Sequence, residues 1–268
     1  MSDSHILQGK RAVVFGAGGS IGAAVAKAFA VEGAEVFLSG RSAESLTVVE
    51  KAIADKGGIA HSDVVDALDE AAVTTYLEAV AGQAGGIDVS INATGPRISA
   101  YGNGKPAVQL PVDEFMSALN TVLKSQFITA HRVADHMLGQ GSGVIILLTG
   151  SPAKPHTPGT SGIGAAFAAV ENLTRTMAME LGNAGVRVVC LRTAANPDTR
   201  TIRDTCDLLA AMRGITADQA VANLAESTLL KRSPHTDDTA KAAVLLASDL
   251  ARMMTGTVHN ATAGVCPD

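Results

Sequence analysis

The stretch LLTGSPAKPHTPGTSGIGAAFAAVENL, residues 147–173, gathers the side chains of this sequence that are most able to do chemistry. A run of aliphatic residues leads to Ser151, and Lys154 and His156 follow within five positions. A hydroxyl can hold a substrate oxygen, and histidine exchanges protons near neutral pH because its ordinary pKa is about 6.5. We therefore expect Ser151 at an active site, with Lys154 as a solvated surface cation.

A second group of residues has the spacing of a phosphate-binding turn. The sequence FGAGGSIGAAVAKAF follows the first apolar run and opens a helix. Glycines let the backbone turn tightly and approach a pyrophosphate, while the start of the helix offers unpaired N–H groups and a partial positive charge. The predicted turn comprises Gly16, Gly18, Gly19, Ser20, Ile21 and Gly22.

Later segments complete the predicted dinucleotide site. Arg41 follows the second apolar run, where an Asp or Glu would bind the ribose of NAD; an arginine there can instead hold a 2′-phosphate. This favours NADP(H) over NAD(H), with a merely solvated arginine as the alternative. Asp63 and Val64 either flank the adenine or form a polar cap and a core valine. The remaining predicted cofactor residues are Asn92, Ala93 and Thr94.

These residues need a scaffold, and the order of apolar runs predicts one. Short β-branched runs alternate with longer amphipathic, Ala-rich stretches, which indicates a doubly wound parallel α/β sheet of about seven strands with helices on both faces. We expect residues 1–268 to form one Rossmann-type domain. An insertion at 198–230, with two helices, either covers a ligand as a lid or only adds packing. The predicted strands are residues 11–17, 34–40, 58–64, 88–95, 143–150, 186–193 and 256–264.

Composition narrows the classes of partner. The 21 basic and 26 acidic residues give a net charge of −5 without a cluster of Lys and Arg, so nucleic acid is not an expected partner. No apolar run approaches the roughly 20 residues of a membrane helix, and the first residues lack a signal-peptide pattern, so we expect a cytoplasmic protein. The three cysteines form no CxxC pair or Cys/His cluster, so we expect no metal site.

The order of motifs resembles the short-chain dehydrogenase/reductase family over essentially the whole length. The matching segments are GAGGSIG, INATG, HMLGQGSGVIILLTGS, LTRTMAMELGNAGVRV and TAKAAVLLASDLARMMTG. The resemblance implies hydride transfer between a nicotinamide and a carbonyl or alcohol carbon, and a homo-oligomer, commonly a tetramer or dimer. In the family a Ser holds the substrate oxygen, a Tyr moves the proton, a Lys lowers the pKa of that Tyr, and an Asn fixes a relay water.

Only the Ser of these four family positions, Ser151, keeps its residue type. Counting back from LTRTMAMEL places the Tyr position on Ile163 and the Lys position on Phe167, and the Asn position falls on Val122. Asn120 lies two residues away, on a different face of the expected helix. The Pro-Gly that the family places after its sixth strand is here Thr193-Ala194.

Replacements for the lost acid and base can be sought nearby. His156 follows Ser151, and Tyr101 lies in a loop that can overhang the substrate, with Arg97 close by; both candidates are more often surface groups. A pocket lined by Ile163, Phe167 and Met212 would suit a small apolar substrate, although such residues are as often core.

Three functions fit this pattern. The first is an NADP(H)-dependent oxidoreductase acting on an activated acceptor, such as an enone or iminium, by a non-standard proton transfer. The second is a cofactor-bound catalyst without redox activity, such as a cyclase. The third is a pseudoenzyme or regulatory subunit. We rank the first ahead because the cofactor-binding half is well kept.

Overall fold

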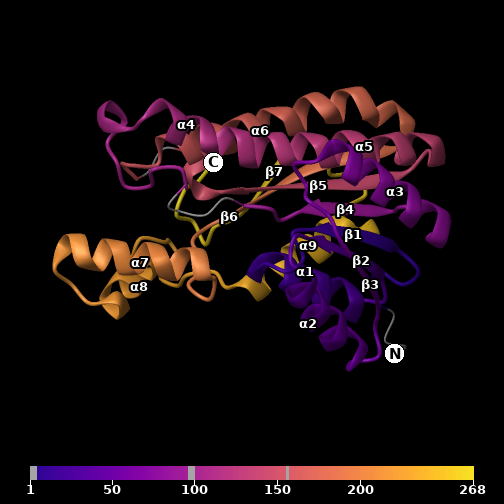
Figure 1. Cartoon of the computed structure of the whole chain (residues 1–268), viewed down its shortest axis with the longest axis horizontal. Coiled ribbons are helices and arrows are strands. Elements are labelled where there is room, and N and C mark those ends of the chain that lie inside the picture. The colour runs from indigo at the N-terminus through magenta and orange to yellow at the C-terminus, as the bar shows by residue number, and fades with distance from the viewer. Residues whose placement is uncertain (1–4, 96–99, 155–156) are drawn as a thin grey trace.

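Seven parallel strands form one sheet in the computed structural model, which describes residues 5–95, 100–154 and 157–268. Their order across the sheet is β3-β2-β1-β4-β5-β6-β7, so each predicted strand is present (Figure 1). The strands are β1 (Arg11–Phe15), β2 (Glu35–Gly40), β3 (Ile59–Val64), β4 (Val89–Asn92), β5 (Gly143–Gly150), β6 (Val186–Thr193) and β7 (Val258–Ala261).

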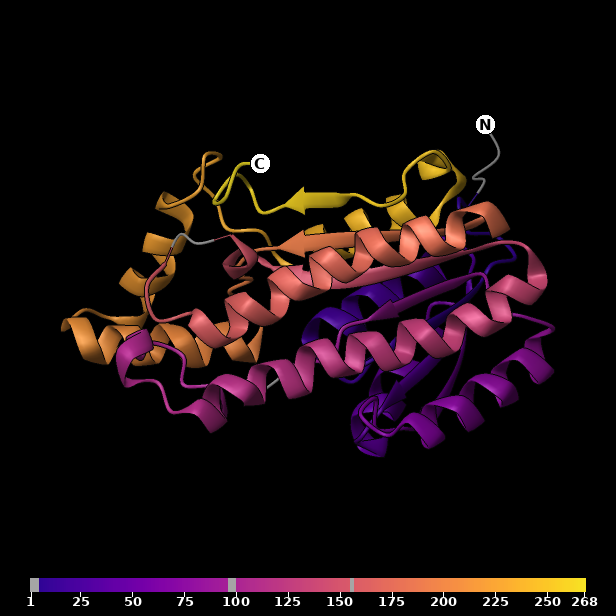
Figure 2. The ribbon, with the colours of Figure 1, turned by 90° about the horizontal axis from the view of Figure 1, so that it is seen from above.

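Helices cover both faces of the sheet, as Figures 1 and 2 show. Each face buries its own apolar core, because side chains of a strand point alternately to either side. One layer consists of α1 (Ser20–Val31), α2 (Ala43–Ala54) and α9 (Thr236–Ala247). The other contains α3 (Glu70–Ala84), α4 (Val112–Ala118), α5 (Lys124–Gln140) and α6 (Ser161–Leu181). Among the described residues, no helix is long and apolar enough to cross a membrane.

The strand order reverses between β1 and β4, and this reversal determines where a ligand can bind. β1 pairs with β2 on one side and with β4 on the other, with Phe15 opposite Asn92. Helices that leave these two strands in opposite directions open a crevice at the carboxyl ends, where ligands of doubly wound sheets bind. The glycine-rich turn and the end of β4 therefore lie at the same place.

A π-turn joins α4 to α5 without a break in the helical path. It spans Leu119–Leu123, and the flanking residues keep helical dihedral angles. Here the hydroxyl of Ser125 donates a hydrogen bond to the carbonyl of Val122, 3.2 Å away.

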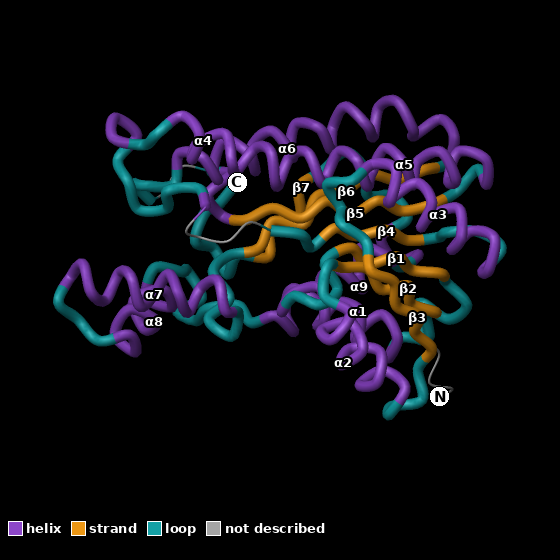
Figure 3. The backbone as a smooth tube through the Cα atoms, in the orientation of Figure 1, coloured by secondary structure: helices purple, strands orange, loops and turns teal. Residues whose placement is uncertain are grey.

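The insertion after β6 forms the two predicted helices, α7 (Arg200–Arg213) and α8 (Ala217–Glu226). They pack on one another around a small apolar cluster of their own, built on Cys206, Ala210 and Ala220. Figure 3 shows the pair projecting from the body of the molecule, at the end of the sheet where β6 terminates. Its position beside the strand ends is the one that a lid requires.

Candidate active site

The glycine-rich turn passes close to the neighbouring strand end. Gly16 follows β1 with φ of +73°, and a Cβ added there would lie 2.9 Å from the backbone nitrogen of Thr94. A Cβ at Gly22 would collide with the carbonyl oxygen of Gly16, and one at Gly18 would lie 2.9 Å from Cβ of Ser45. Steric contacts therefore explain why each of these three positions is a glycine. The turn packs closely against the end of β4 and against α2.

The first helix begins without a side-chain cap, as a phosphate site requires. Gly19 is the N-cap of α1 and supplies no capping side chain, and Ser20 and Ile21 form its first turn. The N–H groups of that turn are hydrogen-bond donors that intrahelical bonding does not use. A pyrophosphate fits this arrangement because it accepts hydrogen bonds and is favoured by the helix dipole.

Arg41 lies where the sequence places it, directly after β2. Its side chain is exposed, and Gly40, the last residue of the strand, is half-buried. The next residue, Ser42, caps α2 by accepting a hydrogen bond from the backbone N–H of Ser45. The guanidinium therefore lies beside a helix start, where an anionic group would meet two sources of positive potential.

Asp63 and Val64, which the sequence predicts beside the adenine, end β3, and both side chains are exposed. Val64 is 63% exposed, so the alternative that it belongs to the core is wrong. β3 is an edge strand of the sheet, and its exposed last two residues precede the loop to α3. Asp63 and Val64 form an open edge next to Arg41 across the β2–β3 register, in which Gly40 lies opposite Val64.

Asn92 is buried at the end of β4, and its side chain forms hydrogen bonds that hold this strand end in place. Its amide group donates to Thr129 Oγ1 at 3.0 Å, and its Oδ1 accepts from the N–H of Thr94 at 2.8 Å. The N–H of Ala93 donates to the carbonyl of Phe15 in β1. These bonds fix the backbone of residues 92–94 against the glycine-rich turn, while the side chain of Asn92 is already occupied.

Ser151 begins the turn after β5 and is buried. The ring of Phe167 lies against this strand end, since a Cβ added to Gly150 would be 2.9 Å from Cε2 of Phe167. The family's lysine position thus places a half-buried aromatic ring beside the Ser. The sequence predicts Lys154 as a solvated surface cation. In the structure its ammonium instead pairs with Asp268 at 2.7 Å.

The other two lost positions belong to one apolar cluster. Val122 sits in the π-turn and Ile163 in the first turns of α6, and both are buried within the core of this layer. Asn120 is exposed, which confirms that it lies on a different face. Tyr101 is buried in the same cluster, and this burial raises the pKa of its phenol to about 12. Its hydroxyl stays protonated near neutral pH.

The structure does not place some of the predicted residues at the candidate site. His156 and Arg97 lie outside the described residues, and the side chain of Met212 is likewise not described. Thr193 is buried, but its hydroxyl lies 2.8 Å from that of Thr239 and so is engaged within the fold. Ala194 is half-buried at the exit of β6.

Two polar features of the site region were not predicted. Gln126 is buried on α5 and donates to the carbonyls of Asn92 and Leu148 at 2.9 and 3.3 Å. Its Oε1 has no hydrogen-bond partner among the described residues. Arg192 on β6 pairs with Glu171 on α6. The only available signal was the pair of arginines, Arg187 and Arg192, in the largely apolar run VRVVCLRT.

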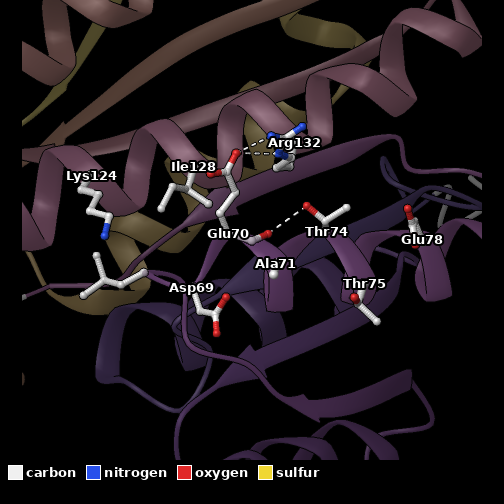
Figure 4. A pocket seen from close by; sticks show the side chains of 10 residues that line it. Asp69, Glu70, Ala71, Thr74, Thr75, Glu78, Lys124, Ile128 and Arg132 are labelled. Atoms are coloured by element: carbon white, nitrogen blue, oxygen red, sulfur yellow. Dashed lines mark hydrogen bonds and ion pairs between the residues drawn. The ribbon is translucent and has the colours of Figure 1, made fainter.

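A surface groove of about 880 Å³ lies between α3 and α5, apart from these residues (Figure 4). Arg132 of α5 pairs with Glu70 of α3 along it, and Lys124 lines it at one end. The lining carries charges of both signs, and it includes none of the predicted site residues. The groove is therefore not the candidate active site.

Comparison with known proteins agrees with this geometry. The sequence model of a family described as enoyl-(acyl carrier protein) reductase matches residues 16–266. Gluconate 5-dehydrogenase of Gluconobacter oxydans is 33% identical over 69% of this chain and 71% of its own. The 7α-hydroxysteroid dehydrogenase of Escherichia coli is 27% identical over 98% of this chain and 96% of its own.

Solved structures show the same likeness. 7α-Hydroxysteroid dehydrogenase, in complex with NADH and 7-oxo glycochenodeoxycholic acid, has a TM-score of 0.84 at 27% identity, covering 98% of this chain and 97% of its own. NAD⁺-bound xylitol dehydrogenase has a TM-score of 0.88 at 25% identity, over 95% and 98% of the two chains. With its glycine-rich turn at the strand-order reversal and Ser151 at the end of β5, the chain belongs to the short-chain dehydrogenase/reductase family of oxidoreductases.

Proposed function

We propose that this protein is an NADP(H)-dependent oxidoreductase that transfers hydride to or from a small, apolar, activated substrate such as an enone. The proposal rests on two observations taken together. The turn has a glycine at each of three positions where a Cβ would clash, and apolar side chains stand at the three predicted catalytic positions. The proton transfer would then differ from the family's Tyr-x-x-x-Lys arrangement.

The described residues fit a dinucleotide. Gly16, Gly18 and Gly22 leave room where a Cβ would clash, and the uncapped first turn of α1 can bind the pyrophosphate. Arg41 at the start of α2 would hold a 2′-phosphate, which supports NADP(H) over NAD(H). A bound nicotinamide would supply or accept the hydride at its C4.

The chain's own residues would orient the substrate and exclude water. The hydroxyl of Ser151 would donate a hydrogen bond to the substrate oxygen at the end of β5. The half-buried ring of Phe167, beside Gly150, would contact an apolar substrate and strengthen that hydrogen bond by displacing water.

The lost proton relay limits the class of substrate. General acid–base catalysis contributes about 10²- to 10⁴-fold, or roughly 3 to 5 kcal/mol of barrier. Neither Ile163 nor Phe167 can supply it, and the raised pKa of Tyr101 makes its phenol a weaker proton donor than an ordinary tyrosine while leaving almost no phenolate to act as a base. A conjugated or cationic acceptor would provide that activation itself, with the proton drawn from water or from a loop residue.

Titration with NADPH and NADH, followed by nicotinamide fluorescence, tests the cofactor half of the proposal. We expect the wild-type protein to bind NADPH more tightly, and Arg41→Ala to weaken NADPH binding about 10- to 100-fold because a charge-assisted hydrogen bond is lost. NADH binding should hardly change. The control is Lys51→Ala, which removes an exposed cation from the other end of α2.

Turnover on enones and iminium compounds tests the catalytic half. We expect Ser151→Ala to lower kcat/KM about 10- to 100-fold, since the substrate oxygen loses one donor, while NADPH affinity is retained. Tight NADPH binding without turnover on any activated acceptor would instead favour a non-redox catalyst or a regulatory subunit. Failure to bind either nucleotide would reject the proposal.

A further inference from the structure

The ends of β4 and β5 separate at the candidate active site, and one buried glutamine bonds to both. β4 pairs with β5 as far as Asn92, opposite Leu147, and ends there, whereas β5 continues along β6 to Gly150. The chain after β4 contains residues predicted to contact the cofactor, and the chain after β5 begins with Ser151. The spacing of these two strand ends therefore sets the distance between the two halves of the site.

The separation leaves a backbone carbonyl without its expected donor. The N–H of Val144 donates to the carbonyl of Asp88, so the backbone groups of Val144 point toward β4. Leu148 lies an even number of residues further along β5 and points its carbonyl the same way. The continued register would bring the N–H of Thr94 to that carbonyl, but this N–H donates to Oδ1 of Asn92 instead, at 2.8 Å. The carbonyl of Leu148 needs another donor.

Gln126 supplies that donor. It lies on α5 and is 1% exposed, and its Nε2 donates to the carbonyl of Leu148 at 3.3 Å and to that of Asn92 at 2.9 Å. One amide nitrogen thus joins the last paired residue of β4 to β5. The orientation of the amide is fixed, because an Oε1 turned toward two carbonyl oxygens would be repelled.

Packing alone does not account for a glutamine at this position. Oε1 of Gln126 is buried and accepts no hydrogen bond from the part of the chain that the structure describes. A buried acceptor without a donor costs stability, and an apolar side chain of similar volume would avoid that cost. The apolar side chain would not bond to either strand end. The contact that distinguishes glutamine here is therefore the bridge made by Nε2.

The bridge adjoins the groups on which the geometry of the reaction would depend. A Cβ added to Gly16 would lie 2.9 Å from the carbonyl carbon of Ala93, so the chain directly after β4 contacts the glycine-rich turn. On the other side, Leu148 precedes Ser151 by three residues. A shift between the strand ends would move the hydroxyl of Ser151 relative to a bound nicotinamide, and a misplacement of about 1 Å can cost about 100-fold in rate.

We propose that Gln126 is a positioning residue, which holds the cofactor-binding end of β4 at a fixed distance from the end of β5 that carries Ser151. As a statement about catalysis, this rests on the proposed function, in which Ser151 binds the substrate oxygen. The link between the strand ends can be measured without any substrate, so the two proposals can fail separately.

Amide hydrogen exchange tests the link itself. Gln126→Leu keeps a similar volume and removes the bridge, so exchange of the N–H groups of residues 92–94 and 148–151 should become at least about ten-fold faster than in the wild type. Gln140→Leu is the matched control. Gln140 ends the same helix, and its amide bonds to the N–H and the carbonyl of Ile87, before the start of β4. This variant should leave exchange at the carboxyl ends unchanged.

Steady-state kinetics with NADPH and an enone separates positioning from support of the fold. We expect Gln126→Leu to lower kcat per folded molecule about 10- to 100-fold, with KM and the NADPH dissociation constant within about two-fold of wild type. Gln140→Leu should keep the wild-type kcat although it also loses bonds to the backbone. Gln126→Glu should regain part of kcat as pH falls, because a protonated carboxyl can donate to one strand-end carbonyl and a carboxylate cannot.

Three results would overturn the inference. They are unchanged exchange at both strand ends in Gln126→Leu, faster exchange with an unchanged kcat, and an equal loss of kcat in Gln140→Leu. A wild-type protein that binds NADPH but turns over no activated acceptor would instead reject the proposed function. The exchange result would then decide alone whether Gln126 holds the two strand ends together.

Discussion

At the residue scale, the three positions that the sequence analysis assigns to the family's Tyr, Lys and Asn carry apolar side chains. Phe167 packs against Gly150, while Val122 and Ile163 are part of the core of their layer. Buried polar groups need partners, so a full set of apolar replacements is more stable than a half-kept relay. One helical turn after Phe167, Glu171 forms a buried ion pair with Arg192.

Removing one member of that pair should strongly destabilise the fold. We expect Glu171→Gln to lower the free energy of unfolding by about 3 kcal/mol, because it leaves a buried guanidinium only partly compensated. Denaturant titration measures this effect. Glu180→Gln makes the same change of charge on an exposed face of α6 and should stay within about 0.5 kcal/mol of wild type. Equal effects of both variants would contradict the assignment.

At the element scale, the π-turn between α4 and α5 survives without the side chain that the family places there. The hydroxyl of Ser125 donates a hydrogen bond to the carbonyl of Val122 within the turn. Gln126, one turn further on, bridges the carbonyl groups at the ends of β4 and β5. The start of α5 thus holds the ends of β4 and β5 in place through Gln126. The side chain of Val122, at the predicted Asn position, cannot bind a relay water.

Restoring the family's residue at this turn should therefore be costly. Val122→Asn would bury an amide in the apolar cluster, and we expect a loss of about 1–3 kcal/mol in unfolding free energy. Asn120→Ala changes an exposed residue of the same turn and is the matched control, with an expected effect within about 0.5 kcal/mol. A Val122→Asn protein as stable as the control would show that the cluster offers the amide a partner.

At the scale of the whole molecule, two helical layers enclose the sheet, and the α7–α8 hairpin projects from them beside the strand ends (Figure 1). The hairpin rests on a small cluster of its own, so it can move as a unit with little loss of core packing. The outer surface of the α5 and α6 layer also carries large apolar side chains, among them Phe127, Leu138 and Met179.

These exposed side chains support the proposal that the protein is a homo-oligomer, as its resemblance to the family implies. We expect light scattering after size exclusion to give the mass of a dimer or tetramer, because apolar surface of this kind is stabilised by burial. Phe127→Asp, at a ring that is 48% exposed and stacked on His131, should shift the mass toward the monomer. Val31→Asp, on the opposite layer, is the control. A wild-type monomer would reject the proposal.

The sequence by itself determined the seven strands and the glycine-rich turn between the first strand and the first helix. These depend on local patterns: β-branched runs form strands, and Gly16 and Gly22 mark close backbone approaches that no other residue permits. The assignment of Ile163 and Phe167 to the family's Tyr and Lys positions stays a prediction from counting along α6.

Only the tertiary structure decided which polar groups meet. Arg192 contacts Glu171 and Asp268, which are 21 and 76 positions away, and Lys154 joins them from the loop after β5. The exposure of Val64 likewise became visible only in the folded chain. Such contacts depend on strand register and on which helix covers which strand, and these are properties of the packed chain that no local pattern specifies.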